Sequence, residues 1–186
     1  MPAMQKNSQS SSTNNTESNS VEKPILPKDS ITVVTPVKEL KPLGPAATEP
    51  ALVPELLVTD TSKSIAFWCG LCGFEIKYQR ADEGFAYISR GTAHVMLEQR
   101  GVGRNWITAP LDQPFGRGIN FQVSVSNLEP ILLSLSEADY PLFMPPETKW
   151  YHVSGIEEAG VQQFLVADPD GYLIRFQASI GRRVIT

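Results

Sequence analysis

The chain has 186 residues, of which 19% are charged, and its formal net charge is −4 at pH 7. A mildly acidic chain lacks the basic surface that nucleic-acid binding normally requires, so we expect no nucleic-acid partner. No stretch approaches the roughly 18 apolar residues of a membrane span, and we therefore expect no membrane partner.

The first 48 residues differ in composition from the rest. Residues 1–20 are almost entirely polar, and the following stretch is rich in proline, with short apolar fragments such as Ile31–Val34 but no sustained periodicity. Such a segment buries too little apolar surface to offset the entropy lost on ordering it. We predict a disordered tail over 1–48 and a single domain over 49–186. A basic segment followed by an apolar one is missing, so a secretory signal is not expected.

Residues 51–99 predict a strand, a helix and three further strands. LVPELLV forms the first strand, and Asp60 or Thr61 caps a helix that ends at Gly73. The apolar residues of this helix recur at near-helical spacing. The next three strands are FEIKYQR, FAYISR and HVMLEQ, separated by the turn-like segments Ala81–Gly84 and Arg90–Gly91.

Cys69 and Cys72 form a C-x-x-C motif, which admits a zinc, a redox or a structural interpretation. A zinc site needs two more ligands, and the only histidines are His94 and His152. A redox pair normally opens a helix after a strand, whereas this pair falls at the end of the predicted helix among core-type residues. We predict a structural role and, because no disulfide is expected, a cytoplasmic protein.

The same order of elements recurs over 116–178, after a linker rich in proline and glycine. Gly118–Val125 is predicted as a strand, and Ser126-Asn127-Leu128-Glu129 as a capping box that opens a helix. A short strand, a long connection and two last strands follow, at Pro141–Met144, Gln162–Ala167 and Tyr172–Gln177. Neither βαβββ unit could bury its sheet face alone, so we predict one α+β domain built from both repeats.

Four stretches carry a resemblance to a known family: VTDTSKSIAFWCGLCGFE, FGRGINFQVSV, MPPETKWY and QQFLVADPDGYLIRF. They resemble the vicinal oxygen chelate superfamily of glyoxalases, bleomycin resistance proteins and dioxygenases, and within it the bleomycin resistance proteins most closely. The resemblance covers nearly all of residues 51–180. It implies that the repeats form a cupped mixed β-sheet. It also implies a homodimer, because bleomycin resistance proteins bind large cationic glycopeptides in two clefts at a dimer interface.

In the enzymes of this superfamily, up to four side chains of the cup hold a divalent metal. Matched by distance from the motifs, three of these positions fall on Val53, Asn120 and Arg175, and Glu98 is the carboxylate expected at the remaining one. Arginine cannot ligate a cation, and one carboxylate with one amide is too little for a divalent metal. We therefore expect no metal, no other cofactor and no catalytic residues. A metal-dependent enzyme of the glyoxalase or dioxygenase type, with an atypical site, is the alternative.

Strand parity predicts a polar cup. Asn120 and Gln122 alternate with apolar residues, as does Arg175, and Glu55 shares the parity of Val53. Aromatic residues in loops or at strand ends would add stacking surfaces. The expected ligand is an antibiotic or a related aromatic, polar small molecule, of which a cationic glycopeptide is one candidate. The predicted ligand-binding residues are Glu55, Phe85, Glu98, Trp106, Phe115, Asn120, Gln122, Trp150, Tyr151 and Arg175.

Two plainer interpretations stay open. Arg175 could form a salt bridge with Glu55 or Glu98 that closes an unused cavity in a dimer without a ligand. Some of the polar residues could simply face solvent, as one face of an antiparallel sheet commonly does.

The sequence also departs from the family pattern in one place. Phe85 matches an aromatic of the family's cleft, but Gly160 and Val161 stand where family members can carry a tryptophan, which argues against bleomycin itself.

Overall fold

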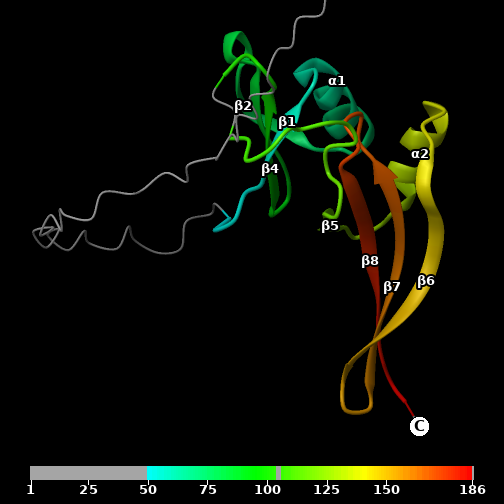
Figure 1. The fold of residues 1–186 in the computed structure, drawn as a ribbon. Helices are drawn as coiled ribbons and strands as arrows, with labels where there is room; N and C mark the ends of the chain where they lie inside the picture. Colours follow the sequence, from blue (N-terminus) through cyan, green and yellow to red (C-terminus); the bar gives the residue numbers. More distant parts are fainter. Residues whose placement is uncertain (1–49, 104–105, 186) are drawn as a thin grey trace, which may run out of the picture. The chain divides into compact units, whose positions relative to one another are not determined.

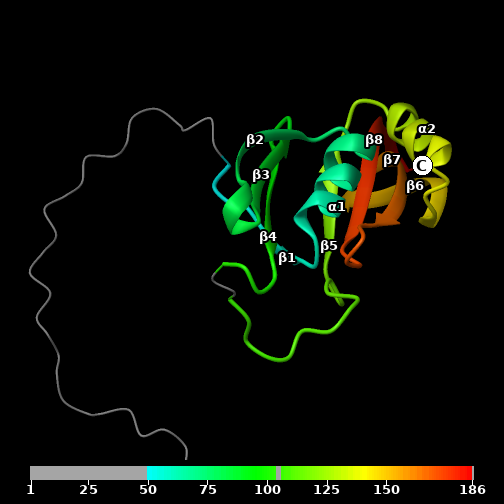
Figure 2. The ribbon, with the colours of Figure 1, turned by 90° about the horizontal axis from the view of Figure 1, so that it is seen from above.

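The computed structural model describes residues 50–103 and 106–185, so the predicted tail over 1–48 lies outside the described residues. The described chain forms two four-stranded sheets with few helices, which confirms the α+β class and the two βαβββ repeats (Figure 1). Figure 2 shows the strands of the two sheets as separate groups. Among the described helices, none has the length and apolar character needed to cross a membrane.

The two sheets repeat one strand order. Sheet A has the order β1-β4-β3-β2, and sheet B has the order β5-β8-β7-β6. In each sheet the first strand pairs in parallel and the other pairs are antiparallel. The strands of sheet A are β1 (Glu55–Val58), β2 (Glu75–Arg80), β3 (Phe85–Arg90) and β4 (Ala93–Gln99), with a short 3₁₀ helix η2 (Ala81–Glu83) between β2 and β3. The strands of sheet B are β5 (Asn120–Ser124), β6 (Leu142–Ser154), β7 (Glu157–Ala167) and β8 (Leu173–Val184).

The first predicted helix is present but changes its type halfway. Asp60 caps α1 (Thr61–Ile65), because its Oδ1 accepts the backbone N–H groups of Ser62 at 2.9 Å and Lys63 at 3.2 Å. The chain then continues as a π-helix, η1 (Ala66–Leu71), in which Trp68 is fully buried. π-Helical turns are rare and leave no simple mark in a pattern of apolar residues, so the spacing predicted only a helix.

Beyond η1, Gly73 ends the helix as predicted, with a left-handed φ of 69°. The Nη1 of Arg90 donates to the carbonyl oxygens of Cys72 at 2.8 Å and Gly73 at 2.9 Å, which satisfies two orphan carbonyls at this helix end. Cys69 and Cys72 are both free thiols, and burial raises the pKa of Cys72 to about 12. A thiol with so high a pKa is packed in the core and is a poor nucleophile.

The helix of the second repeat, α2 (Glu129–Glu137), begins differently from the prediction. The backbone N–H of Glu129 donates to Oδ1 of Asn127 at 2.9 Å, so Asn127 and not Ser126 supplies the side-chain oxygen at this end. Ile131 and Leu135 are buried in the hydrophobic core, as the apolar spacing predicted.

The last three strands are longer than predicted. The prediction of a long connection after Met144 is wrong, because this stretch is part of β6. β6 continues through this stretch to Ser154 because it pairs with β7, and β8 continues to Val184 on the other side of β7. Pro145 and Pro146 made this stretch look like a loop, but they lie on the edge strand at a shift of register, where proline is tolerated. The three strands continue well past α2 (Figure 1). We call residues 149–161 and 178–185 the arm.

Tertiary contacts that no local pattern reveals hold the arm together. A Cβ on Gly160 would lie 2.7 Å from both Trp150 and Ile180, so the glycine makes room for these two side chains. The guanidinium of Arg183 lies 4.2 Å above the Trp150 ring and also pairs with Glu158.

One hydrophobic core serves both repeats, and the DPDG turn before β8 ties them together. The indole N–H of Trp68 donates to Asp168 at 3.2 Å, and the backbone N–H of Thr59 donates to Asp170 at 3.0 Å. The hydroxyl of Tyr172 donates to the carbonyl of Leu57 at 3.0 Å. Burial raises the pKa of Asp168 to about 6, although the hydrogen bonds it accepts from Tyr172, Trp68 and Asp170 oppose this shift.

Candidate functional site

Sheet A has one face packed against its helix and one open face. α1 contacts β3 and β4, and the residues on that side, among them Ala86, Ile88 and Leu97, are fully buried. On the open face Phe85 lies opposite Glu98 across β3 and β4, and Glu55 lies opposite Met96 across β1 and β4. Strand alternation thus brings predicted residues from three strands to one face.

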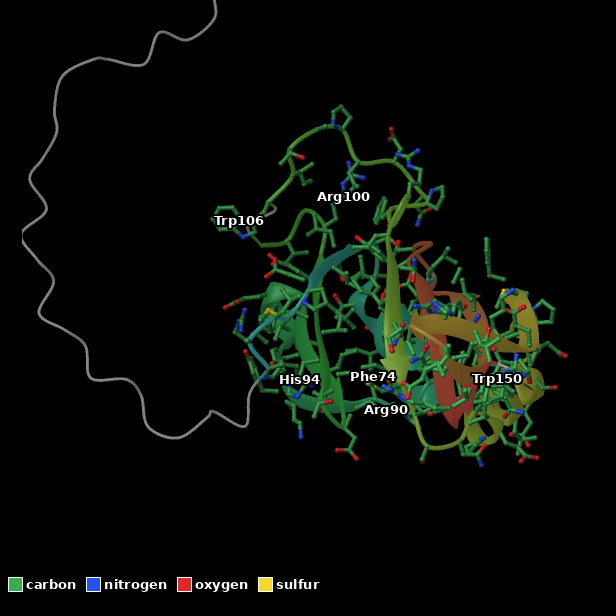
Figure 3. The ribbon with its side chains drawn as sticks, turned by 90° about the horizontal axis from the view of Figure 1, so that it is seen from below. Phe74, Arg90, His94, Arg100, Trp106 and Trp150 are labelled. Carbon is green, nitrogen blue, oxygen red and sulfur yellow. The ribbon has the colours of Figure 1, made fainter. Side chains whose placement is uncertain are left out.

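A cavity of about 180 Å³ lies on this open face. We call it the acidic half-site. Four of the predicted ligand-binding residues meet here, although Trp106 is 73% exposed on the linker that follows β4 (Figure 3). The cavity is lined by Glu55, Arg80, Glu83, Phe85, Glu98, Gly103 and Trp106. Three carboxylates and one guanidinium give this half-site an acidic balance.

Arg80 and Glu83 belong to the acidic half-site although their residue types did not single them out. The Nε of Arg80 donates to Oε2 of Glu83 at 2.5 Å, and its guanidinium carbon lies 3.8 Å from the centre of the Phe85 ring. Their separation of three residues, across the η2 turn between two strands, was the one available signal.

Stacked aromatic rings continue the open face of sheet A toward β2. The Tyr78 ring is nearly parallel to that of Tyr87, at 7° and 5.2 Å, and it also stacks on Phe85 at 5.9 Å. The hydroxyl of Tyr87 hydrogen-bonds Nδ1 of His94 at 2.9 Å. The rings of Tyr78, Tyr87 and His94, together with Val53, border a second cavity of about 550 Å³. Sequence reasoning missed both tyrosines, although Tyr87 has the same parity as Phe85.

Sheet B also has an open face, and the parity predicted for it is confirmed at three positions. Ile174 and Phe176 are fully buried on the helix side of β8, whereas Asn120 and Gln122 of β5 are exposed on the other side. Gln122 and Arg175 are register partners, and Nη2 of Arg175 donates to Oε1 of Gln122.

Tyr151 joins the open face of sheet B through Gln163, a residue that sequence reasoning missed. The Nε2 of Gln163 donates to the hydroxyl oxygen of Tyr151 and to Oε1 of Glu147, each at 2.8 Å. The sequence places Gln162 and Gln163 side by side, and only the pairing of β7 with β8 decides which of them points to this face. We call Asn120, Gln122, Glu147, Tyr151, Gln163 and Arg175 the amide half-site.

Two predicted residues do not belong to either half-site. Phe115 is 8% exposed and packs in the core, with its ring 6.4 Å from that of Tyr172, so its role in binding stays a prediction. Trp150 packs against Gly160 and under Arg183, on the face of β6 opposite to Tyr151. A loop aromatic cannot be assigned to core or surface from its position in the sequence alone.

The salt bridge considered for Arg175 is not formed. Arg175 belongs to sheet B and bonds Gln122, whereas Glu55 and Glu98 belong to sheet A. Within residues 50–103 and 106–185, the structure records no ion pair of Arg175.

The donor set at the expected metal positions does not fit a divalent cation. Glu98 offers one carboxylate and Asn120 one amide oxygen, but Val53 offers no ligand atom and the guanidinium of Arg175 repels cations. Among the described residues, no cluster of three or more His, Cys, Asp or Glu side chains is arranged to hold a metal ion.

One known superfamily matches most of the described chain. Residues 51–176 match the sequence model of the Glyoxalase/Bleomycin resistance protein/Dioxygenase superfamily. No curated protein matches the chain. A solved structure of a glyoxalase/bleomycin resistance protein/dioxygenase superfamily member from Vibrio splendidus 12B01 is 38% identical, with 68% of this chain and 95% of that chain covered and a TM-score of 0.31.

Two further solved structures resemble this chain in fold alone. A virulence protein from Salmonella typhimurium is 16% identical, with 73% of this chain and 100% of that chain covered and a TM-score of 0.54. TioX from Micromonospora sp. ML1 is 22% identical, with 69% of this chain and 98% of that chain covered and a TM-score of 0.51.

Proposed function

Because the chain belongs to the glyoxalase/bleomycin resistance protein/dioxygenase superfamily, we propose that it binds an aromatic, polar small molecule without transforming it, in a cleft that a second copy completes. The observation that carries this proposal is the pair of half-sites. One is acidic and aromatic, and the other carries amides and a guanidinium. Together they offer the stacking planes and the few placed polar groups that are typical of a small-molecule pocket.

The size of the acidic half-site supports completion by a partner copy. Pockets for drug-sized ligands usually measure about 300–1,000 Å³, and the acidic half-site encloses only about 180 Å³. Apolar side chains lie exposed near both half-sites, with Tyr78 50% exposed on sheet A and Ile119 48% exposed before β5. A second chain that covered these side chains would bury apolar surface and enlarge the cavity.

The charges of the acidic half-site favour a cationic part of the ligand. Glu55, Glu83 and Glu98 surround a ring, Phe85, that already holds one guanidinium over its face. Carboxylates and aromatic faces both attract organic cations. A cationic glycopeptide antibiotic is one ligand with this chemistry, and sequestration of such a compound is the biological role that we propose.

Binding without turnover is favoured over metal-dependent catalysis by one residue above all. Arg175 occupies the position at which the superfamily's enzymes carry a carboxylate ligand, and it uses its guanidinium to bond Gln122. A positive charge there opposes a divalent cation in a partly desolvated cup.

Titration calorimetry combined with a mass measurement in solution tests the proposal. We expect a dimer that binds bleomycin-type glycopeptides or smaller aromatic cations stoichiometrically, with the ligand recovered unchanged by mass spectrometry. Chemical conversion of the ligand, or near-stoichiometric iron, zinc, nickel or manganese in protein purified without chelator, would instead favour the metal-dependent enzyme. A monomer that binds none of these compounds would refute the proposal.

A further inference from the structure

Gln163 is an unusually placed glutamine on the open face of sheet B. Its side chain is only 3% exposed, and its Nε2 donates to Glu147 and Tyr151. Its carbonyl oxygen, Oε1, is buried and accepts no hydrogen bond. Buried polar groups nearly always have partners, so an orphaned acceptor on this open face indicates a ligand group that donates to it.

A hydrogen-bond donor that is likewise buried and unpaired lies on the neighbouring strand, β8. The Nε of Arg175 is also buried and has no partner, although its Nη2 is engaged with Gln122. Gln163 pairs with Gln177, and Leu165 pairs with Arg175, so Gln163 and Arg175 are diagonal neighbours on one face. Diagonal neighbours lie on the order of 7–8 Å apart at their Cα atoms, within reach of two long side chains.

We infer that this donor and acceptor together recognise a carboxamide group of the ligand. The carbonyl of that group would accept from Nε of Arg175, and its N–H would donate to Oε1 of Gln163. The inference rests on the proposed binding function and specifies the chemistry of one end of the ligand.

The charges around the pair select a neutral group. A carboxylate would satisfy Arg175, but it would oppose Oε1 of Gln163 and lie near the carboxylate of Glu147. An ammonium or amidinium would satisfy Gln163 and Glu147, but the guanidinium of Arg175 would repel it. A carboxamide carries a donor and an acceptor side by side without net charge, so it alone among these three satisfies both atoms.

One side chain must shift when such a group enters. Tyr151 is 39% exposed and accepts a single hydrogen bond from Gln163, so it can turn toward solvent, where water replaces that bond. Glu147 keeps the hydrogen bond from Nε2 of Gln163, so its carboxylate stays beside the bound group.

Three ligands of one shape test the inference: benzamide, benzoate and benzamidine. They share a phenyl ring with a planar substituent that is neutral, anionic or cationic. We expect millimolar affinities for ligands of this size. Titrations followed by amide NMR should show benzamide binding at sheet B about tenfold more tightly than either charged analogue, because each of these leaves one group unpaired or repelled.

Two variants should reverse the order of affinity in opposite directions. Arg175→Met removes the donor and its charge, so Gln163 and Glu147 should now favour benzamidine. Gln163→Met removes the acceptor, so Arg175 should favour benzoate. Gln177→Met changes the register partner of Gln163 on the same face and should leave benzamide preferred.

The outcomes separate this inference from the proposed function. Equal affinity for the three ligands, or no shift of sheet B resonances at millimolar concentration, would overturn the carboxamide inference even if glycopeptides bind. Loss of the order in Gln177→Met would overturn it as well. If a variant fails to fold, as its NMR spectrum would reveal, the order measured with the unmodified protein still decides. The proposed function is judged separately by dimer formation and ligand recovery.

Discussion

The two repeats share one strand order but differ in both the chemistry and the length of their strands. The open face of sheet A carries carboxylates and stacked aromatic rings, whereas that of sheet B carries amides and a guanidinium. β2 and β3 have six residues each, but their counterparts β6 and β7 have 13 and 11. A repeated backbone therefore supplies two different surfaces, and function must be argued from the side chains on each.

Both repeats contribute to the shared core, so a change in this core should destabilise both of them together. Trp68 of the first repeat is fully buried, contacts Phe74 edge to face and donates to Asp168 of the second repeat. Trp68→Ala should lower the free energy of unfolding by about 3–5 kcal/mol, because it leaves a cavity and removes the hydrogen-bond partner of Oδ2 of Asp168. Urea unfolding followed by circular dichroism measures this.

Its control, Phe143→Ala, removes a ring that is 66% exposed on β6 and should change stability by less than about 0.5 kcal/mol. If the Trp68 variant lost only signals of the first repeat, the two repeats would not form one cooperative unit.

Asp168 should make the link between the repeats dependent on pH. Its pKa is about 6 in the folded chain against 3.8 for an ordinary aspartate, so the folded state binds more protons between these values. The contribution of Asp168 to the free energy of unfolding is then greatest below pH 4, and it falls by roughly 2–3 kcal/mol as pH rises through 6. The measured quantity is the difference in slope of stability against pH between the unmodified protein and Asp168→Asn.

Between pH 4 and 6, the stability of Asp168→Asn should fall less, or rise more, with increasing pH than that of the unmodified protein. Parallel pH profiles of the two proteins would show that the carboxylate titrates normally in the folded state.

The arm distinguishes sheet B from sheet A and depends on one glycine. Gly160→Val would place atoms against Trp150 and Ile180, since even a Cβ at this position would lie 2.7 Å from both. Overpacking of this kind costs about 1–3 kcal/mol. Hydrogen exchange of arm amides should report the loss locally.

Gly70→Ala is the matched change for the arm experiment, because a Cβ there meets nothing within 4 Å. It should leave the exchange of the arm amides unchanged. A Gly160 variant with unchanged exchange would mean that Trp150 and Ile180 can rearrange without loss.

The smallest effect expected is on affinity at the acidic half-site. Glu55→Gln removes one of its carboxylates and should weaken a cationic ligand about two- to fivefold, since exposed charge pairs contribute about 1 kcal/mol or less. Glu137→Gln, an exposed change on α2, provides the control with equal loss of charge. Calorimetry at two salt concentrations should show the difference shrink at high salt. Equal affinities of the two variants would place the cation elsewhere.

Local patterns predicted more of sheet A than of sheet B. β2, β3 and β4 agree with the predicted strands to within a residue because each is short, alternating and bounded by a turn. β6 was mostly missed, because its prolines and polar residues are compatible with a strand only while β7 pairs beside them. Among the predicted site residues, eight belong to one of the two half-sites, whereas Phe115 packs in the core and Trp150 lies on the other face of β6.

The sequence by itself determined the repeated βαβββ order, a helix cap at Asp60 or Thr61 and the polar parity of Gln122 and Arg175, because these depend on neighbours a few residues apart. Only the tertiary structure decided that Gln163 lies on the open face of sheet B with an unpaired oxygen, that Phe115 is core, and that Gly160 makes room for the arm. These features depend on strand register and on side chains distant in sequence, which set burial and hydrogen bonding together and leave no local signal.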